Sequence, residues 1–502
     1  MKKILKKLAL SISVFLLMQS IFAQNEVDAL RFSETDWQGS ARFMGAGRAF
    51  GAVGAEFSAL NLNPASIGLY KKSDIIFTPM TVSVYKNSSE YNEFGVLSQD
   101  VKYNLNNAGI VLALPGISSS LWKKFQIGFG YNRINNYNTI FSIRGNNKGR
   151  TIGSAYANIA KGLDINDLYD EKIWSDEMFL AYDYWLISPE QGGSNTYFGT
   201  YEGKNFRHSS TVKRAGGNDE MIFSFGTNYA DKLYLGITLG IPFIDFTENR
   251  TFREENFDDK ALYNFQHISF DDKLNVRATG INLKLGVIYQ PVDFLRFGFA
   301  FHTPTYYGNV KDYFESEINF RKWEKDTLGS NKYYSDRVKY VNEHRYSLTT
   351  PLRAMTNVAF FIAQRAFISA EYEITDYSMA NMSSVFYDFN DPFGDNENQI
   401  IQQMYGVCHT ARIGAEMNLS PVFAIRAGYN YTSSPFKNNI NDGSKHYASA
   451  GFGFRTKHFY GDFAYALTIC KEKYWMYDAR FVNAVNNKFF THRIMMSMGV
   501  RF

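Results

Sequence analysis

The sequence contains only two cysteines, and it has no long apolar stretch beyond its first residues. Its basic and acidic residues are nearly equal in number. Its only cysteines are Cys408 and Cys470, which permit one disulfide but exclude a disulfide framework. After residue 23 no apolar run approaches the length of a transmembrane helix, although 17% of the residues are aromatic. The net charge of +4 resides in four lysines near the N-terminus, and the remainder is balanced, which excludes the basic footprint of a nucleic-acid-binding protein.

Motifs for catalysis and metal binding are missing as well. The eight histidines are scattered, with no pair at metal-binding spacing and no HExxH sequence. No nucleophile motif and no phosphate-binding loop stands out. We therefore expect no catalytic residue, no metal site and no cofactor, and we keep a serine lipase as the enzymatic alternative.

The N-terminus has the pattern of a secretory signal. Lysines 2, 3, 6 and 7 precede an apolar run from Leu8 to Met18, and Ala23 stands before Gln24. This order predicts a cleaved signal peptide over residues 1–23. An uncleaved anchor is the alternative, but the apolar run is shorter than a membrane-spanning helix requires.

The remaining chain has the alternation of membrane-spanning strands. In the last eleven residues one face is apolar, from Ile494 to Phe502, and the other carries polar and small residues such as Arg493 and Ser497. The high content of Tyr and Phe fits strands with a lipid-facing side and interfacial rings. A chain of such polarity crosses a bilayer only as a closed barrel, because closure leaves no strand edge unpaired.

From Asp74 onward, alternating segments are joined in turn by short and long connections, the longest being about residues 145–218. This arrangement predicts about 14 antiparallel strands with both ends in the periplasm. Residues 24–73 instead carry small residues at helical spacing, which predicts short helices. We therefore expect an all-β transmembrane protein: an outer-membrane barrel formed by residues 74–502, with a small helical hatch, residues 24–73, in its lumen.

The hatch segment also carries a family resemblance. The run from Asp36 to Gly47 and the run from Ala59 to Leu69, which includes the triplet Asn63-Pro64-Ala65, closely resemble the hatch of the FadL/TodX family. Those proteins are outer-membrane channels for long-chain fatty acids and other hydrophobic compounds. Similarity extends along the chain to the ending Gly499-Val500-Arg501-Phe502 and departs mainly in Gly145–Asn218. The resemblance implies gating by the hatch, and the residues concerned are Phe43, Phe57, Asn61, Asn63, Pro64 and Ala65.

The resemblance further implies that the ligand is caught between extracellular loops, enters an apolar pocket in the lumen and leaves sideways where the third strand kinks. The third strand is expected over Phe125–Arg144. Its alternation is interrupted by polar residues, which predicts a bulge or bend, although the strand leaving the bilayer there would give the same pattern. The residues of this wall kink are Asn132, Arg133, Asn135 and Asn136.

Two further groups of residues are candidate sites. Charges at inward positions predict a structural ladder across the lumen, with a role in transport as the alternative; its members are Glu371, Glu373, Arg412, Glu416, Arg426 and Asp462. The longest loop contains aromatic residues that predict either a capture groove for a hydrophobic ligand or a small core that holds the loop together. These are Trp174, Phe179, Tyr182 and Trp185.

From these observations we expect passive, diffusion-driven uptake of hydrophobic small molecules, long-chain fatty acids or related lipids, across the outer membrane of a Gram-negative bacterium. The expected partners are a hydrophobic ligand, outer-membrane lipid and lipopolysaccharide, and the protein is expected to be a monomer. A binding or adhesion barrel for a host or haem-type ligand, without transport, is the alternative function.

Overall fold

The computed structural model describes residues 26–116, 120–165, 181–182, 184–190, 195–256, 265–325, 331–363, 365–385 and 395–502. The predicted signal peptide lies outside these residues, as do the predicted capture residues Trp174 and Phe179. No helix among the described residues is long and apolar enough to cross a membrane.

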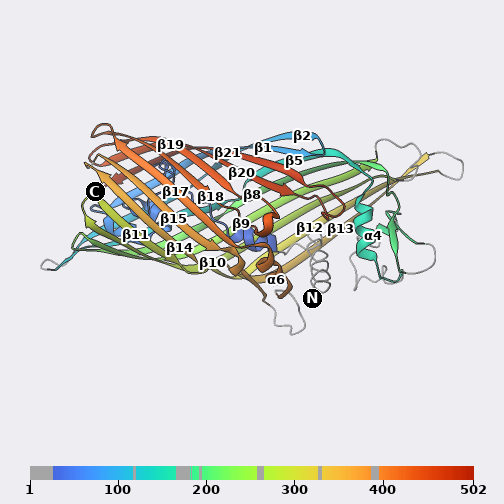
Figure 1. Cartoon of the computed structure of the whole chain (residues 1–502), viewed down its shortest axis with the longest axis horizontal. Coiled ribbons are helices and arrows are strands. Elements are labelled where there is room, and N and C mark those ends of the chain that lie inside the picture. Colours follow the sequence, from blue (N-terminus) through green and yellow to red (C-terminus); the bar gives the residue numbers. More distant parts are fainter. Residues whose placement is uncertain are drawn as a thin grey trace.

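The chain forms a closed antiparallel β-barrel of 14 strands, which confirms the predicted fold class (Figure 1). The barrel closes because β1 pairs with β2 and β3 on one side and with the last strand, β21, on the other. The strands of the wall are β1 (Asp74–Tyr91), β2 (Phe94–Asn104), β3 (Asn107–Pro115), β4 (Trp122–Asn136), β5 (Thr139–Lys148), β8 (Asn205–Tyr229), β9 (Leu233–Asn256), β10 (Phe265–Val292), β11 (Leu295–His302), β12 (Tyr306–Lys325), β13 (Asn331–Thr349), β14 (Arg353–Ile362), β15 (Ala366–Asp376), β16 (Asn381–Ser384), β17 (Val407–Asn418), β18 (Phe423–Thr432), β19 (Lys445–Arg455), β20 (Phe459–Tyr474) and β21 (Val485–Arg501).

Several spanning strands consist of two consecutive segments, and proline explains two of the breaks. β11 and β12 are separated at Pro304, and the neighbouring β13 and β14 are separated at Pro351. Proline has no backbone N–H for the ladder, so pairing stops there. The two breaks adjoin, and Thr350 N donates to Thr305 O at 3.0 Å across them. The remaining two-segment strands are β2 with β3, β4 with β5, and β15 with β16.

The two faces of the wall follow the alternation in the sequence. On β11, Phe297 and Phe299 are 49% and 48% exposed on the outside, whereas Ala300 and His302, which follow them at the other phase of the alternation, are buried in the lumen. The apolar face is therefore on the outside, where a bilayer would cover it.

The lumen is filled by the N-terminal segment, which precedes β1. This hatch contains α2 (Glu26–Ser33), α3 (Ala41–Gly45) and the 3₁₀ helices η1 (Phe57–Asn61) and η2 (Pro64–Leu69). Its backbone approaches the wall closely: a Cβ on Gly428 of β18 would lie 2.1 Å from the Gly47 nitrogen, and Gly47 has a φ of +66°. A side chain at position 428 would have no room, and the backbone conformation at position 47 is one that glycine adopts without strain.

The strands extend further than the sequence predicts. The loop expected over 145–218 is shorter, because β5 continues to Lys148 and β8 begins at Asn205. Hydrogen bonding between the strands continues beyond the part of the wall whose outer face is apolar, because backbone hydrogen bonds do not depend on apolar side chains. The connections at this long-loop end contain β6 (Ile187–Pro189), β7 (Tyr197–Gly199), α4 (Ile152–Ala160), η4 (Tyr377–Met379), α6 (Asp395–Met404) and η5 (Lys437–Asn439); α4 lies at the end opposite the C-terminus (Figure 1).

Candidate functional site

The hatch motif Asn61 to Ala65 lies in the lumen against β10 and β14. Asn63 caps η2, because its Oδ1 accepts from Ala65 N at 3.0 Å, and Pro64 occupies the first helical position, where no N–H is needed. The Asn63 side chain also donates to Val287 O and to Asn357 Oδ1, both at 3.4 Å. The motif therefore fixes a hatch turn to the inner wall.

The two predicted gating phenylalanines have different surroundings. Phe43 packs beside Phe50 within the hatch, with ring centroids 6.0 Å apart. Phe57 lies against the wall, where a Cβ on Gly109 of β3 or on Gly130 of β4 would lie 2.2 and 2.5 Å from its ring. Glycines in both strands thus make room for the Phe57 ring beside the third spanning strand.

The hatch is joined to the third spanning strand by backbone hydrogen bonds. Asp36 N donates to Ile134 O and Gln38 N donates to Arg133 O, both at 3.0 Å. The Asn135 side chain donates to Glu34 O at 3.0 Å. Residues 34–38 therefore act as an additional partner for β4, so the hatch and this strand cannot move independently without breaking these bonds.

The other predicted kink residues lie at the same point. The β4–β8 ladder shifts register between Arg133 and Asn135, and β4 ends at Asn136. Arg133 makes a fork to Asp219, with Nε to Oδ1 at 2.7 Å and Nη2 to Oδ2 at 3.1 Å. Asn132 is fully buried, and neither of its amide atoms has a hydrogen-bond partner among the described residues.

Beyond this point the wall lacks one ladder. β2 pairs with β1, and β5 pairs with β8, but in the described part of the chain β2 and β5 do not pair with each other. The two segments lie side by side, and Ser142 N donates to Ser98 Oγ at 3.0 Å between them. β5 also contacts β1, where Asn87 Nδ2 donates to Thr139 Oγ1 at 3.1 Å. Two strand edges thus face each other without a continuous ladder.

The six residues of the predicted charge ladder lie buried in the lumen as two connected groups. Arg412 contacts Glu371 at 2.8 Å and Glu373 at 2.5 Å, and Arg426 contacts Glu416 and Asp462, both at 2.7 Å. Both groups also hold the hatch. Glu371 accepts from Gly51 N at 3.0 Å, and Arg42 makes a two-point contact with Glu416 at 2.9 Å.

Several further charged residues of this interface between hatch and wall were not predicted from the sequence. Lys284 of β10 forms a buried ion pair with Glu220 of β8. Asp36 of the hatch pairs with Arg48 at 2.6 Å and with Arg493 at 2.8 Å. Burial alone would raise the pKa of Asp36, but the nearby Arg48, Arg493 and Lys445 outweigh it and hold the pKa well below its usual range. Asp36 therefore stays ionised and anchors the hatch segment that contacts β4.

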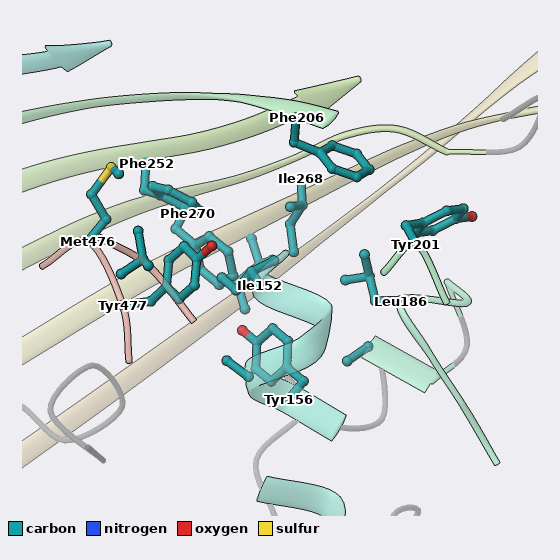
Figure 2. Packing of buried hydrophobic residues seen from close by; sticks show 14 of the residues in the cluster. Ile152, Tyr156, Leu186, Tyr201, Phe206, Phe252, Ile268, Phe270, Met476 and Tyr477 are labelled. Carbon is teal, nitrogen blue, oxygen red and sulfur yellow. The ribbon is translucent and has the colours of Figure 1, made fainter. Parts of the chain in front are cut away.

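At the long-loop end, the described part of the longest loop forms a packed cluster (Figure 2). Ile152 and Tyr156 of α4 lie with Leu186 and Tyr201 over Phe206, Phe252 and Phe270 of the strand ends. A buried polar chain secures the contact: Tyr91 Oη lies 3.0 Å from His208 Nδ1, His208 Nε2 lies 2.8 Å from Glu254, and Glu254 accepts from Ile152 N.

The two described aromatics predicted to capture ligand lie at this cluster in different environments. Tyr182 is half-buried and packs against it. Trp185 is 62% exposed and has a φ of +60°. The loop therefore combines a packed core, which Tyr182 joins, with an exposed indole at Trp185.

Cavities among the described residues differ in size and lining. Two lumen cavities of about 30 Å³ each lie beside Trp37 and carry polar side chains, including Glu373 in one and Lys284 in the other. A larger one of about 390 Å³ opens at the short-turn end beside Leu69 and Phe361. Among the described residues no group of His, Cys, Asp and Glu is arranged to hold a metal, and Cys408 and Cys470 are free.

Comparison with known proteins gives the fold. No protein-family model and no curated protein matches the sequence. A FadL homologue from Pseudomonas aeruginosa superposes with a TM-score of 0.53 at 12% identity, over 93% of this chain and 99% of that one. Two structures of the toluene transporter TodX from Pseudomonas putida give TM-scores of 0.51 and 0.50 at 10% identity, each over 93% of this chain and 99% of the other. The chain thus has the fold of the FadL and TodX channels.

Proposed function

We propose that this protein is an outer-membrane channel for passive uptake of hydrophobic small molecules, long-chain fatty acids or related lipids. One observation carries the proposal: residues 34–38 of the hatch are bonded to β4 at its register shift, next to the unpaired edges of β2 and β5. A movement of the hatch is thereby coupled to the part of the wall where a ladder is missing.

In this proposal the long-loop end faces the outside, and exposed aromatic surface such as Trp185 receives the ligand. Hydrophobic burial supplies the affinity, at roughly 0.8 kcal/mol for each buried CH₂ group. The ligand then enters an apolar space that opens when the hatch shifts. Breaking the bonds from Asp36 and Gln38 to β4 releases the strand, and the ligand leaves sideways between β2 and β5.

Several properties follow from this role. The chain carries no motif for energy coupling, so transport runs down a concentration gradient. We propose that residues 1–23 are a cleaved export signal, that the barrel works as a monomer without a cofactor and without catalysis, and that its outer face contacts membrane lipid and lipopolysaccharide.

Uptake of a radiolabelled long-chain fatty acid tests the proposal. Cells that lack the gene should take up the label slowly, and expression of the full chain should restore the rate. Mass spectrometry of the purified protein should find a co-purified fatty acid or related lipid. Unchanged uptake in the deletion strain, together with protein free of lipid, would contradict the proposal.

The adhesion alternative is distinguished by trimming the longest loop. A variant in which a short linker replaces residues 150–203 keeps β5 and β8, which end and begin outside this range. Under our proposal this variant loses uptake at low ligand concentration. Loss of adhesion to host cells with uptake unchanged would favour the adhesion function instead.

A further inference from the structure

Three tyrosine–histidine pairs on the outer surface have the same geometry. Each joins a tyrosine Oη to a histidine Nδ1 on the neighbouring strand. In each, the tyrosine lies two residues from the residue directly opposite the histidine. The pairs are Tyr372–His409 at 2.6 Å, Tyr429–His446 at 2.7 Å and Tyr465–His492 at 2.7 Å.

The three pairs also lie at one height. When each strand register is extended at constant offset through the positions that lack a partner, one circuit of the barrel from Ile75 leads back to β1 near Glu90. The pairing therefore rises by about one residue per strand toward the long-loop end. Each histidine after the first lies two strands further on. It is two residues closer to the short-turn end than the position to which the ladder leads from the histidine before it. The rise of two residues over two strands and the offset of two residues toward the short-turn end cancel. The three pairs therefore lie at the same height on the barrel, and we call them the belt.

The belt presents hydrogen-bond donors outward. The three tyrosines are 43%, 43% and 44% exposed on the face that carries the apolar band. In apolar surroundings a phenol hydrogen needs an acceptor, and the imidazole Nδ1 supplies it. A neutral imidazole that accepts at Nδ1 carries its hydrogen on Nε2. Each histidine therefore offers an N–H to the surrounding lipid.

Above one of these pairs lies a group of exposed lysines. Lys471 of β20 and Lys488 of β21 are directly opposite each other, and Lys473 and Lys86 are their neighbours on β20 and β1. They share the outward face with the Tyr465–His492 pair but lie closer to the long-loop end. Like charges directly opposite each other destabilise a sheet. Among the described residues no carboxylate lies within salt-bridge distance of these lysines; Lys488 Nζ lies 5.0 Å from the centroid of the Phe490 ring, and Glu90 is the acidic residue diagonal to Lys488 on this face.

We infer that this surface, the lysine patch of Lys86, Lys471, Lys473 and Lys488 above His492, binds a phosphorylated lipid of the outer leaflet. The ammonium groups match phosphate, and the imidazole N–H, nearer the middle of the bilayer, matches an acyl carbonyl oxygen below the phosphate. The site borders β1, whose other neighbour β2 has the unpaired edge. A lipid bound here would line one side of the proposed exit. The inference rests on the outer-membrane location in the proposed function.

Binding of diphosphorylated lipid A to the purified full-length protein in detergent tests the inference. We expect saturable binding that the double variant Lys471→Gln with Lys488→Gln weakens at least tenfold. The matched control is Lys457→Gln, an exposed lysine in a turn at the opposite end, which should bind like the wild type. A variant that keeps the charge, Lys471→Arg with Lys488→Arg, should retain binding and shows that loss is not due to misfolding.

The role of the histidine needs a second measurement. His492→Gln should weaken binding severalfold for both diphosphorylated and dephosphorylated lipid A, whereas the lysine variant should affect only the phosphorylated form. Equal binding by the wild type and the double lysine variant, or equally tight binding of dephosphorylated lipid A, would overturn the inference. Full displacement by millimolar inorganic phosphate would also overturn it, because it would show a simple anion site.

The outcomes separate this inference from the proposed function. A protein that binds the phosphorylated lipid through these lysines but gives no fatty-acid uptake contradicts only the channel. Fatty-acid uptake by the protein, together with lipid binding that the lysine substitutions do not change, contradicts only the lipid site.

Discussion

At the scale of the residue, Phe57 is the side chain through which the packing of the hatch against the wall can be tested by substitution. Its ring is 1% exposed and fills the space above two glycines of β3 and β4. Phe57→Ala leaves a cavity there and should lower the free energy of unfolding by about 3–5 kcal/mol. Urea unfolding of the barrel in lipid vesicles measures this.

The control is Phe454→Ala on the outer surface. The Phe454 ring is 51% exposed and faces the lipid side, so its loss should cost clearly less. An equal loss of stability in both variants would show that Phe57 is no anchor of the hatch.

Asp28 gives the hatch a dependence on pH. Burial raises the pKa of Asp28 to about 6, although Arg31 at 2.5 Å opposes the shift. A carboxyl whose pKa is raised on folding contributes stability that is complete below its ordinary pKa and is lost as the pH rises through the folded value. Between pH 4 and pH 7 the protection of α2 amides from hydrogen exchange should therefore fall, by roughly tenfold or more.

The variant Asp28→Asn imitates the protonated group. Its α2 amides should keep the same protection factors across this range. If the variant loses protection as the wild type does, another group is responsible for the pH dependence.

Individual partners were harder to predict from the sequence than the face on which a residue lies. Alternation placed Glu371, Arg412 and Glu416 at inward positions, but it does not tell which hatch residue reaches them. The contacts with Arg42 and Gly51 depend on the path of the hatch through the lumen. Lys284 and Glu220 were missed because their strands are not adjacent in the sequence, and only the register brings them together.

At the scale of the element, the fork between Arg133 and Asp219 holds β4 at its register shift. Both side chains are largely shielded, at 13% and 14% exposed, so removal of one partner leaves a poorly solvated charge unpaired and costs more than the pair contributes. Arg133→Gln should loosen β4 and raise the exchange rates of the Asp36 and Gln38 amides, by about tenfold or more.

Arg277→Gln is the matched control for this prediction. Arg277 and Asp245 form a pair at 3.6 Å that is 80% and 69% exposed, and such surface pairs contribute little. The hatch amides should exchange at the wild-type rate in this variant. If the Asp36 and Gln38 amides exchange at the wild-type rate in Arg133→Gln, the proposed coupling between β4 and the hatch is wrong.

The extents of the elements were only partly predictable. The interruption of β4 coincides with a change in the alternation of the sequence, whereas the outer parts of β8, β12 and β13 carry polar residues on both faces. Apolar alternation marks the part of a strand that meets lipid, and pairing above that part leaves no such pattern. The loop predicted over about residues 145–218 was therefore too long.

At the scale of the whole molecule, the sequence predicted the closed barrel of 14 strands, and the structure confirms it. The prediction was possible because a bilayer permits few solutions for a polar chain without long apolar segments. The missing ladder between β2 and β5 was not predictable in the same way, since these segments belong to consecutive spanning strands, which ordinarily pair. A sideways exit at the third spanning strand was implied only by the family resemblance.

Locking the two unpaired edges together tests the central claim, lateral exit between β2 and β5. The Ser98 hydroxyl and the Ser142 amide nitrogen already lie 3.0 Å apart, so Ser98→Cys with Ser142→Cys places two thiols at the junction, in a background with Cys408→Ala and Cys470→Ala. Fatty-acid uptake by cells that carry the oxidised double variant is the measurement. We predict that the disulfide reduces uptake at least tenfold, that reduction restores it, and that each single cysteine variant takes up label normally. Full uptake with the disulfide formed would contradict the account.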